Sequence, residues 1–442
     1  MECAMKDWRY NLHIEDCRAI KMADINLSEI TVLSGVNASG KSTIARMFRD
    51  LIEVSACYDR LLAGWFWREY LADWYYFVYS AWRRIKTKED DSSIQFNLLH
   101  NIDIYENLVR GKITLDEAVD GVEDGVRKLM SILKTNQEAM TLRYIRPLMR
   151  RFGVEDNEQI ILAKFSKRKN SVLQLYSEAV QRRTRDQYRK LLPETSLFDG
   201  SVTLQEGDAS VFTSLLQSGK LEEISWLKRA IYIESPFKSI PKGDIRTTLK
   251  MGDDPFVRIH HLNELLPQLK DADTLFNVLS GTIGFESFED SFEDERWMYH
   301  RLDGRDFSLD ECATGIKSFS ILNILFMNGW LNSETLLIID EPEVHLHPQW
   351  VVEYAKILLL LAKKFKVRLL LTSHSPDMIN ALHTIGKSMG LSDVMNFYLA
   401  EKDSVDPYKY NYRSLGCKVG DIFKAYNVSF SKIEDYANHG EY

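Results

Sequence analysis

Residues 35–43 constrain the fold of this 442-residue chain more than any other segment. They read Gly-Val-Asn-Ala-Ser-Gly-Lys-Ser-Thr and match G-x-x-x-x-G-K-S/T, a loop whose backbone N–H groups surround the phosphates of a nucleotide. Residues 28–34 before it are rich in β-formers, and apolar residues follow it at helical spacing: Ile44, Met47, Phe48, Leu51 and Ile52. Such a loop requires a strand before it and a helix after it, so the sequence predicts a nucleotide-binding α/β domain.

The positions of this loop have separate roles. Gly35 and Gly40 supply backbone freedom where a Cβ would clash. Lys41 can reach the β- and γ-phosphates, and the Ser42 hydroxyl is placed to hold Mg²⁺. We therefore expect ATP and Mg²⁺ as cofactors. Nucleotide binding is assigned to the loop residues Gly35, Asn37, Ser39, Gly40, Lys41, Ser42 and Thr43.

Two apolar segments far downstream each end in polar side chains. Residues 335–343 deliver Asp340 and Glu341, and residues 367–374 end in His374. We expect Asp340 to bind Mg²⁺ and Glu341 to polarise the attacking water as general base. A histidine at the end of a hydrophobic strand, after a strand with paired carboxylates, is better interpreted as a γ-phosphate sensor than as a core residue. The expected catalytic residues are Lys41, Glu341 and His374.

These three elements, in this order, resemble the ATP-binding-cassette (ABC) superfamily, and more narrowly the branch with RecF, the chromosome-maintenance ATPases and the OLD-type phage-exclusion proteins. The marks of the branch are the runs 11–20, 340–348 and 372–376. The resemblance implies an α/β fold, an ABC-type P-loop ATPase head, in which two copies of the chain sandwich ATP and hydrolyse it. It also implies that Arg18 touches phosphate.

The family's signature loop corresponds to residues 309–317. Gly315 falls at the family's glycine, but Ala313 replaces the usual serine and Thr314 stands beside it. The resemblance implies that Thr314 and Gly315 contact the nucleotide bound by the partner copy. Three interpretations stay open. In the first, the Thr314 hydroxyl stands in for the serine; in the second, ATP turnover is slow; in the third, Thr314 is only the N-cap of a helix that begins near Lys317.

The sequence predicts an ATPase lobe assembled from both chain ends, residues 1–55 and 225–405. A mainly helical insertion, residues 56–224, interrupts it, and residues 406–442 form a short C-terminal tail. Within the lobe we expect a short strand over 231–236.

Two further features are expected in the second part of the lobe. Residues 297–302 and 305–309 read as a hairpin across Asp303-Gly304, and residues 396–400 as a strand followed by a short helical tail.

The five cysteines show no ligand or disulfide spacing, and the first residues lack the apolar core of a signal peptide. We therefore expect a cytoplasmic protein.

His345 and His347 fit the ATPase pattern better than a zinc site.

Ten of the eighteen residues in 65–82 are aromatic. Arg68, Glu69 and Asp73 within this run disfavour a membrane span, because charges are costly in lipid. Packing inside the helical insertion and an interface with another subunit or partner both remain open. We expect no membrane partner.

Residues 143–190 hold 13 Lys/Arg against 5 Asp/Glu, whereas the whole chain has a net charge of −8. This asymmetry fits a nucleic-acid or acidic-protein surface, or ordinary solvated helix faces. A nucleic-acid partner through this segment therefore stays open.

Two functions compete. One is an anti-phage defence ATPase, acting as a homodimer or larger oligomer, that controls a separate effector protein such as a nuclease. The other is a RecF-like repair or chromosome-maintenance ATPase acting on duplex DNA; a membrane-transporter cassette is disfavoured by the large helical insertion.

OLD-type nucleases append a metal-binding domain after the histidine strand, whereas 68 residues follow His374 here and their acids are scattered. Glu401 and Asp403 are the two acids that most resemble a metal-binding pair. We expect them to lie at a solvated strand end. We therefore expect no nuclease within the chain.

Overall fold

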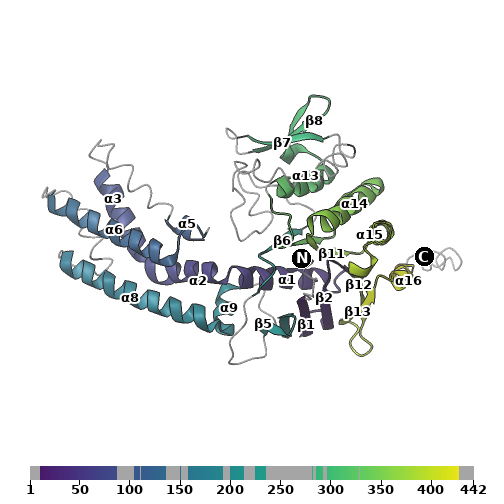
Figure 1. Ribbon diagram of the computed structural model, residues 1–442, viewed down its shortest axis with the longest axis horizontal. Coiled ribbons are helices and arrows are strands. Elements are labelled where there is room, and N and C mark those ends of the chain that lie inside the picture. Colours follow the sequence, from purple (N-terminus) through teal and green to yellow (C-terminus); the bar gives the residue numbers. More distant parts are fainter. Residues whose placement is uncertain are drawn as a thin grey trace, which may run out of the picture. The chain divides into compact units, whose positions relative to one another are not determined.

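The computed structural model describes residues 10–86, 104–109, 111–135, 150, 158–192, 200–213, 224–234, 281, 285–291, 296–327 and 329–427. The chain divides into two compact units, whose elements are labelled in Figure 1. The sheet unit comprises Met1–Ala56, Leu192–Gln217 and Leu221–Tyr442. The helical unit comprises Cys57–Leu191 and Ser218–Lys220.

A ten-stranded sheet, in the order β5-β4-β1-β2-β13-β12-β3-β11-β10-β6, forms the centre of the sheet unit. Its strands are β1 Tyr10–Cys17, β2 Ile20–Leu27, β3 Ile30–Ser34, β4 Ser201–Glu206, β5 Ala209–Thr213, β6 Arg229–Glu234, β10 Thr335–Asp340, β11 Arg368–Ser373, β12 Met395–Lys402 and β13 Tyr410–Gly416. The expected α/β class is confirmed.

The five neighbouring strands β12, β3, β11, β10 and β6 are parallel. Every residue of β3 and β10 is buried, as expected for parallel strands covered on both faces. Because these strands run in the same direction, their C-terminal ends meet at one edge of the sheet. β1, β2, β4 and β5 continue the sheet as antiparallel neighbours.

Helices cover both faces of the parallel strands (Figure 1). The helix α1, Lys41–Ala56, contacts β6, β10 and β11. On the opposite face α13, Thr314–Met327, α14, Pro348–Phe365, and α15, Pro376–Ser388, share one apolar core with alternate residues of the strands. The short helix α16, Gly420–Tyr426, follows β13.

Local sequence signals define where α14 and α15 begin and end. Each starts with proline at its first position, where a missing N–H costs nothing. The Ser375 hydroxyl accepts a hydrogen bond from the backbone N–H of Met378 and caps α15. α14 ends at Lys366, which adopts a left-handed conformation.

A separate three-stranded sheet consists of β7, Phe285–Ser291, β8, Arg296–Arg301, and β9, Asp306–Ser308. β8 and β9 form the predicted hairpin, and Gly304 in its turn has a φ of +76°. Two short helices, Leu309–Glu311 and Ser392–Val394, lie in described connections of the sheet unit.

The helical unit contains α2 Tyr58–Phe66, a π-helical turn Trp67–Leu71, α3 Ala72–Lys86, α5 Ile104–Val109, α6 Leu115–Thr135, α8 Glu158–Arg182 and α9 Arg185–Leu191. Much of the aromatic run packs inside this unit. Phe66, Trp67 and Phe77 are buried, and the Trp74 ring makes an edge contact with Phe165 of α8. For these residues, the interpretation as core packing is confirmed.

No helix in the described ranges is long and apolar enough to cross a membrane.

The structure corrects two predicted boundaries. Residues 200–213, expected in the helical insertion, form β4 and β5, and β4 pairs with β1 along most of its length. The main segment of the helical unit therefore ends at Leu191, well before the predicted residue 224. Residues 410–416, expected in a tail, form β13 between β12 and β2. Residues 428–442 lie outside the described part.

Candidate nucleotide-binding and hydrolysis site

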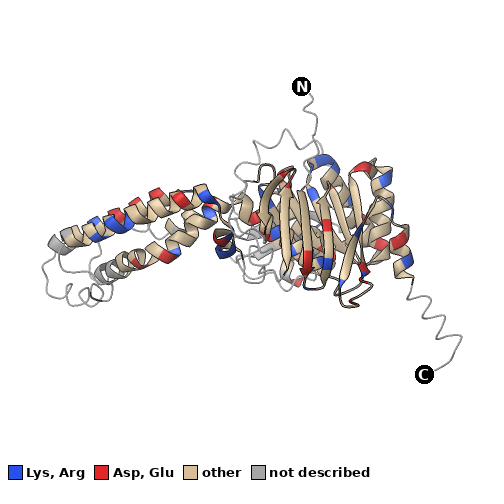
Figure 2. Ribbon diagram, turned by 90° about the horizontal axis from the view of Figure 1, so that it is seen from below, with Lys and Arg blue, Asp and Glu red and all other residues tan. Residues whose placement is uncertain are grey.

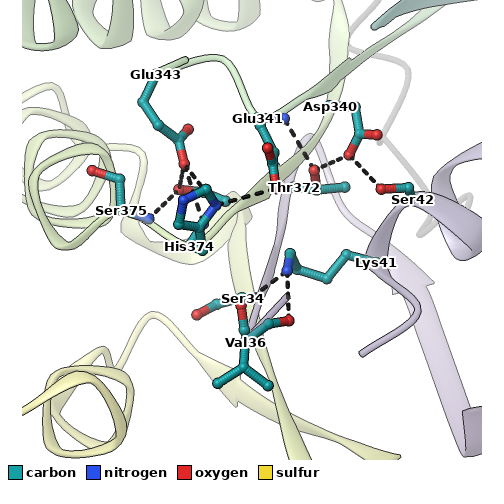
Figure 3. Close-up of polar contacts among 12 residues, drawn as sticks. Ser34, Val36, Lys41, Ser42, Asp340, Glu341, Glu343, Thr372, His374 and Ser375 are labelled. Carbon is teal, nitrogen blue, oxygen red and sulfur yellow. Dashed lines mark hydrogen bonds and ion pairs between the residues drawn. The ribbon is translucent and has the colours of Figure 1, made fainter. Parts of the chain in front are cut away.

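The C-terminal ends of β3, β11 and β10 bring the predicted site residues together (Figure 3). β3 leads into the loop before Lys41, β10 ends at Asp340, and β11 leads to His374. The strand order places β11 between the other two, with Asp340 opposite Thr372 in register. Ser42 and Asp340, which are 298 positions apart in the sequence, thus meet at one edge, where open α/β sheets bind ligands.

The phosphate-binding loop is closely packed around its two glycines. A Cβ on Gly35 would lie 2.7 Å from the Cβ of Ala400, and one on Gly40 would lie 2.7 Å from Cγ1 of Ile20. Gly40 also has a φ of +100°, which disfavours any side chain. These contacts leave space only for glycine, as the motif predicts.

Three other predicted loop residues differ in exposure. Asn37 is exposed and Thr43 is half-buried in the first turn of α1. Ser39 is buried, and its hydroxyl has no hydrogen-bond partner among the described residues.

The Lys41 ammonium group lies across the loop. Its Nζ donates hydrogen bonds to the backbone carbonyls of Gly35 and Val36, each at 2.9 Å. Burial lowers the pKa of Lys41, and the nearby carboxylates, chiefly Glu341 and Asp340, oppose that shift. Neutral carbonyls are weaker partners for an ammonium than phosphate oxygens, so a nucleotide phosphate can replace them.

Ser42 and Asp340 form the pair of oxygen donors predicted for the metal. The Ser42 hydroxyl donates to Asp340 Oδ1 over 3.0 Å, and the Thr372 hydroxyl donates to the same oxygen. The Tyr232 hydroxyl donates to Asp340 Oδ2 over 2.9 Å. Hydroxyl and carboxylate oxygens suit Mg²⁺, which keeps several waters and needs few protein ligands. The residues therefore fit the ion.

Glu341 and His374 lie in contact beside this pair. Oε1 of Glu341 is 3.1 Å from Nδ1 of His374. Glu341 has a positive φ of 54°, and its N–H bonds to the carbonyl and hydroxyl oxygens of Thr372. A strained residue held by its neighbours is a common feature of active sites. The geometry places a carboxylate next to the histidine.

Glu343 is a third carboxylate at the site, and the sequence motifs predict no role for it. Its Oε1 accepts hydrogen bonds from the Ser373 hydroxyl at 2.8 Å and from the His374 backbone N–H at 3.1 Å. Burial raises the pKa of Glu343, although these hydrogen bonds oppose the shift. Glu343 thereby fixes the backbone that carries His374.

Two tyrosines from β13 and α16 hold the loop backbone. The Tyr412 hydroxyl donates to the Ser39 carbonyl at 3.2 Å. The Tyr426 hydroxyl accepts from the Gly35 N–H at 3.2 Å and contacts the Ser34 hydroxyl at 2.7 Å. It also donates to the Ser373 carbonyl. Sequence motifs do not include these tyrosines, because they come from another part of the sheet.

Comparison with known families decides the class of the protein. A model of the AAA ATPase domain matches residues 75–379, more than half of the chain. The chain belongs to the AAA ATPase domain family. The match contains Asp340, Glu341 and His374. As an AAA ATPase domain the protein binds and hydrolyses ATP, which confirms the predicted activity.

Solved structures similar to this AAA ATPase domain are heads of SMC proteins. The Smc head from Pyrococcus furiosus, bound to the C-terminal domain of ScpA, is 11% identical with a TM-score of 0.35; the match covers 97% of this chain and 99% of that chain. The SMC head from Thermotoga maritima is 10% identical with a TM-score of 0.32, covering 92% and 98%. No curated protein matches the chain.

The other residues predicted to contact the nucleotide come from segments other than the ends of β3, β10 and β11. Arg18 is exposed in the turn between β1 and β2. Thr314 is the first residue of α13, so the helix begins three residues before the predicted Lys317. Gly315 is buried, and a Cβ there would lie 2.8 Å from the Trp350 ring. Gly315 thus has a packing role within its own chain.

Alternative metal sites find no support in the described ranges, where no group of three His, Cys, Asp or Glu side chains could hold a metal ion. His347 caps α14 by accepting from the Gln349 N–H, and His345 is exposed. Glu401 pairs with Arg413 at 2.7 Å, while Asp403 accepts backbone hydrogen bonds within its turn.

Proposed function

We propose that this ATPase uses Mg²⁺ and the residues at the ends of β3, β10 and β11 to hydrolyse ATP, and that ATP-driven self-association controls a separate effector protein in anti-phage defence. One observation supports the proposed hydrolysis of ATP: two contacts lie side by side at this edge of the sheet. Ser42 hydrogen-bonds Asp340, and Glu341 contacts His374.

Each residue has a role in this proposal. Lys41 and the loop N–H groups would bind the β- and γ-phosphates. Ser42 and Asp340 would hold Mg²⁺, which would neutralise charge on the phosphates. Glu341 would take a proton from the attacking water, and His374 would hydrogen-bond the γ-phosphate. ATP hydrolysis by wild type and by single variants at these positions tests the assignment.

Self-association would place the loop around Thr314 and Gly315 of one copy against the nucleotide of another. This part rests on the resemblance to ABC-type heads. Because Gly315 also packs on Trp350, a variant of Thr314 tests the trans contact with less risk to folding. Thr314→Val should slow hydrolysis while leaving ATP binding by a single copy unchanged.

The choice between defence and repair rests on charge. Part of the basic 143–190 segment is used within the helical unit: Lys169 bridges to Glu123 at 2.9 Å and also contacts Asp120, while Arg183 lies over the Tyr58 ring. Figure 2 shows acidic and basic residues interspersed along these helices. This mixing and the net charge of −8 favour an effector protein over DNA as the target.

Two experiments separate these functions. Loss of phage resistance in the native host when its own copy of the gene carries Glu341→Gln would support defence. Tight binding of purified protein to generic duplex DNA, weakening steeply with salt, would support the RecF-like alternative instead.

A further inference from the structure

Tyr232 on β6 is a buried residue that reaches the proposed metal site from outside the sequence motifs. Its side chain is 1% exposed, and its hydroxyl donates to Asp340 Oδ2 over 2.9 Å. The other carboxylate oxygen, Oδ1, accepts from Ser42 and Thr372. Each carboxylate oxygen of Asp340 therefore has its own hydrogen-bond donors. Among the described residues, Tyr232 is the donor to Oδ2.

The register of the sheet explains how Tyr232 reaches this position. β6 and β10 are parallel, with Tyr232 opposite Ile338 and Glu234 opposite Asp340. Side chains two residues apart share a face of a strand, so Tyr232 lies on the face of the sheet toward which Asp340 points. This is the face covered by α1, which supplies Ser42.

A second contact orients the Tyr232 hydroxyl. Arg46 Nε donates to the hydroxyl oxygen at 3.3 Å, and Arg46 Nη2 is 2.7 Å from Glu234. Arg46 lies one helical turn after Ser42, on the same face of α1. Because Arg46 can only donate, the tyrosine proton is left for Asp340.

We propose that Tyr232 is a positioning residue, which holds Oδ2 of Asp340 so that Oδ1 faces Ser42 and the metal. The inference rests on the proposed Mg²⁺ site. Groups that orient metal-binding carboxylates in this way change metal affinity by about 10- to 100-fold when removed. Tyr232 would thus set how tightly the nucleotide-loaded protein holds its cation.

The substitution Tyr232→Phe tests this role because it removes the hydroxyl and keeps the ring. Mn²⁺ would replace Mg²⁺ as a paramagnetic probe, and its binding to the ATP-loaded protein would be titrated by electron paramagnetic resonance. We expect the Kd for Mn²⁺ to rise about tenfold. Binding of a fluorescent ATP analogue in EDTA should not change, since Lys41 and the loop are intact.

Tyr398→Phe is the matched control. Tyr398 is fully buried and its hydroxyl accepts from the Asn26 N–H at 2.8 Å, so its substitution also deletes a buried hydroxyl. It should leave the Kd for Mn²⁺ unchanged. If Tyr232→Phe fails to fold, Arg46→Lys keeps the positive charge while it disturbs the hydrogen bond to the same hydroxyl, and it should raise the Kd in the same direction, by a smaller factor.

An equal Kd for Mn²⁺ in wild type, Tyr232→Phe and Tyr398→Phe would overturn the inference and leave the proposed function standing. Failure of wild type to bind Mn²⁺ with ATP would overturn both.

Discussion

Lys41 is a buried cation close to the carboxylates of Asp340, Glu341 and Glu343. Its ammonium group donates hydrogen bonds to two loop carbonyls. The triphosphate of ATP would bring further negative charge to this site. We therefore expect phosphate binding to depend most on Lys41.

The substitution Lys41→Ala should weaken ATP binding by about 100-fold, since lost hydrogen bonds to charged groups cost up to about 3 kcal/mol. Equilibrium binding of a fluorescent ATP analogue measures the change. Lys424→Ala, which removes an exposed lysine of α16, is the control. Wild-type affinity in Lys41→Ala would remove Lys41 from the site.

Glu343 gives a pH-dependent prediction. Burial raises its pKa above the ordinary 4.5, so the folded state holds the proton more tightly than the unfolded chain. The stability that this proton contributes is fully present below pH 4.5 and is lost as the pH rises through the raised pKa. The substitution Glu343→Gln keeps an oxygen that accepts from Ser373 and His374, and it removes the titratable group.

The free energy of unfolding of wild type should therefore fall relative to that of Glu343→Gln as the pH rises above the ordinary glutamate pKa. Urea unfolding of both proteins over a pH series measures the difference. A difference that is constant over the series would show that Glu343 has the same pKa in both states.

Residues that belong to sequence motifs can be assigned to the candidate site from the sequence alone. These are Lys41, Ser42, Asp340, Glu341 and His374. Tyr232, Tyr412 and Tyr426 were not, because a single tyrosine on a strand or helix looks like any other apolar residue. Only the register of distant strands, and the packing of α16 for Tyr426, brings their hydroxyls to the site.

At the scale of elements, the segment from β13 to α16 supports the phosphate-binding loop. Tyr412 and Tyr426 hold its two ends, at Ser39 and Gly35. Tyr426 also reaches the carbonyl of Ser373, directly before His374. The loop and the histidine strand are thus joined through one hydroxyl group.

The substitution Tyr426→Phe should raise the KM for ATP about fivefold, because it removes hydrogen bonds worth about 1 kcal/mol that position the loop. Steady-state kinetics measure KM and kcat separately. Tyr398→Phe should show wild-type kinetics, and an unchanged KM in Tyr426→Phe would mean that the loop holds its shape without the tyrosine.

The parallel strands could be predicted because they are apolar at almost every position. β4 and β13 could not, since their exposed faces carry polar residues and their identity as strands depends on pairing with β1, β2 and β12. Such strands are stabilised by cross-strand partners more than by their own sequence. The sequence pattern therefore places the end of the helical unit too late in the chain.

At the scale of the whole molecule, the proposal requires two copies of the chain. Glu341→Gln with ATP and Mg²⁺ should give a species of at least twice the 51.3 kDa chain mass in light scattering, because binding persists while hydrolysis stops. The same protein with Lys41→Ala added should not associate. A monomer under all conditions would contradict the sandwich arrangement.

The rate of ATP hydrolysis by Glu341→Gln tests the account most directly. The amide cannot accept the proton of water, while Asp340, Ser42 and Lys41 remain in place. We predict ATP binding close to that of wild type and a kcat lower by about 100-fold or more, as expected for loss of a general base. Equal ATP turnover in wild type and Glu341→Gln would contradict the assignment of hydrolysis to this site.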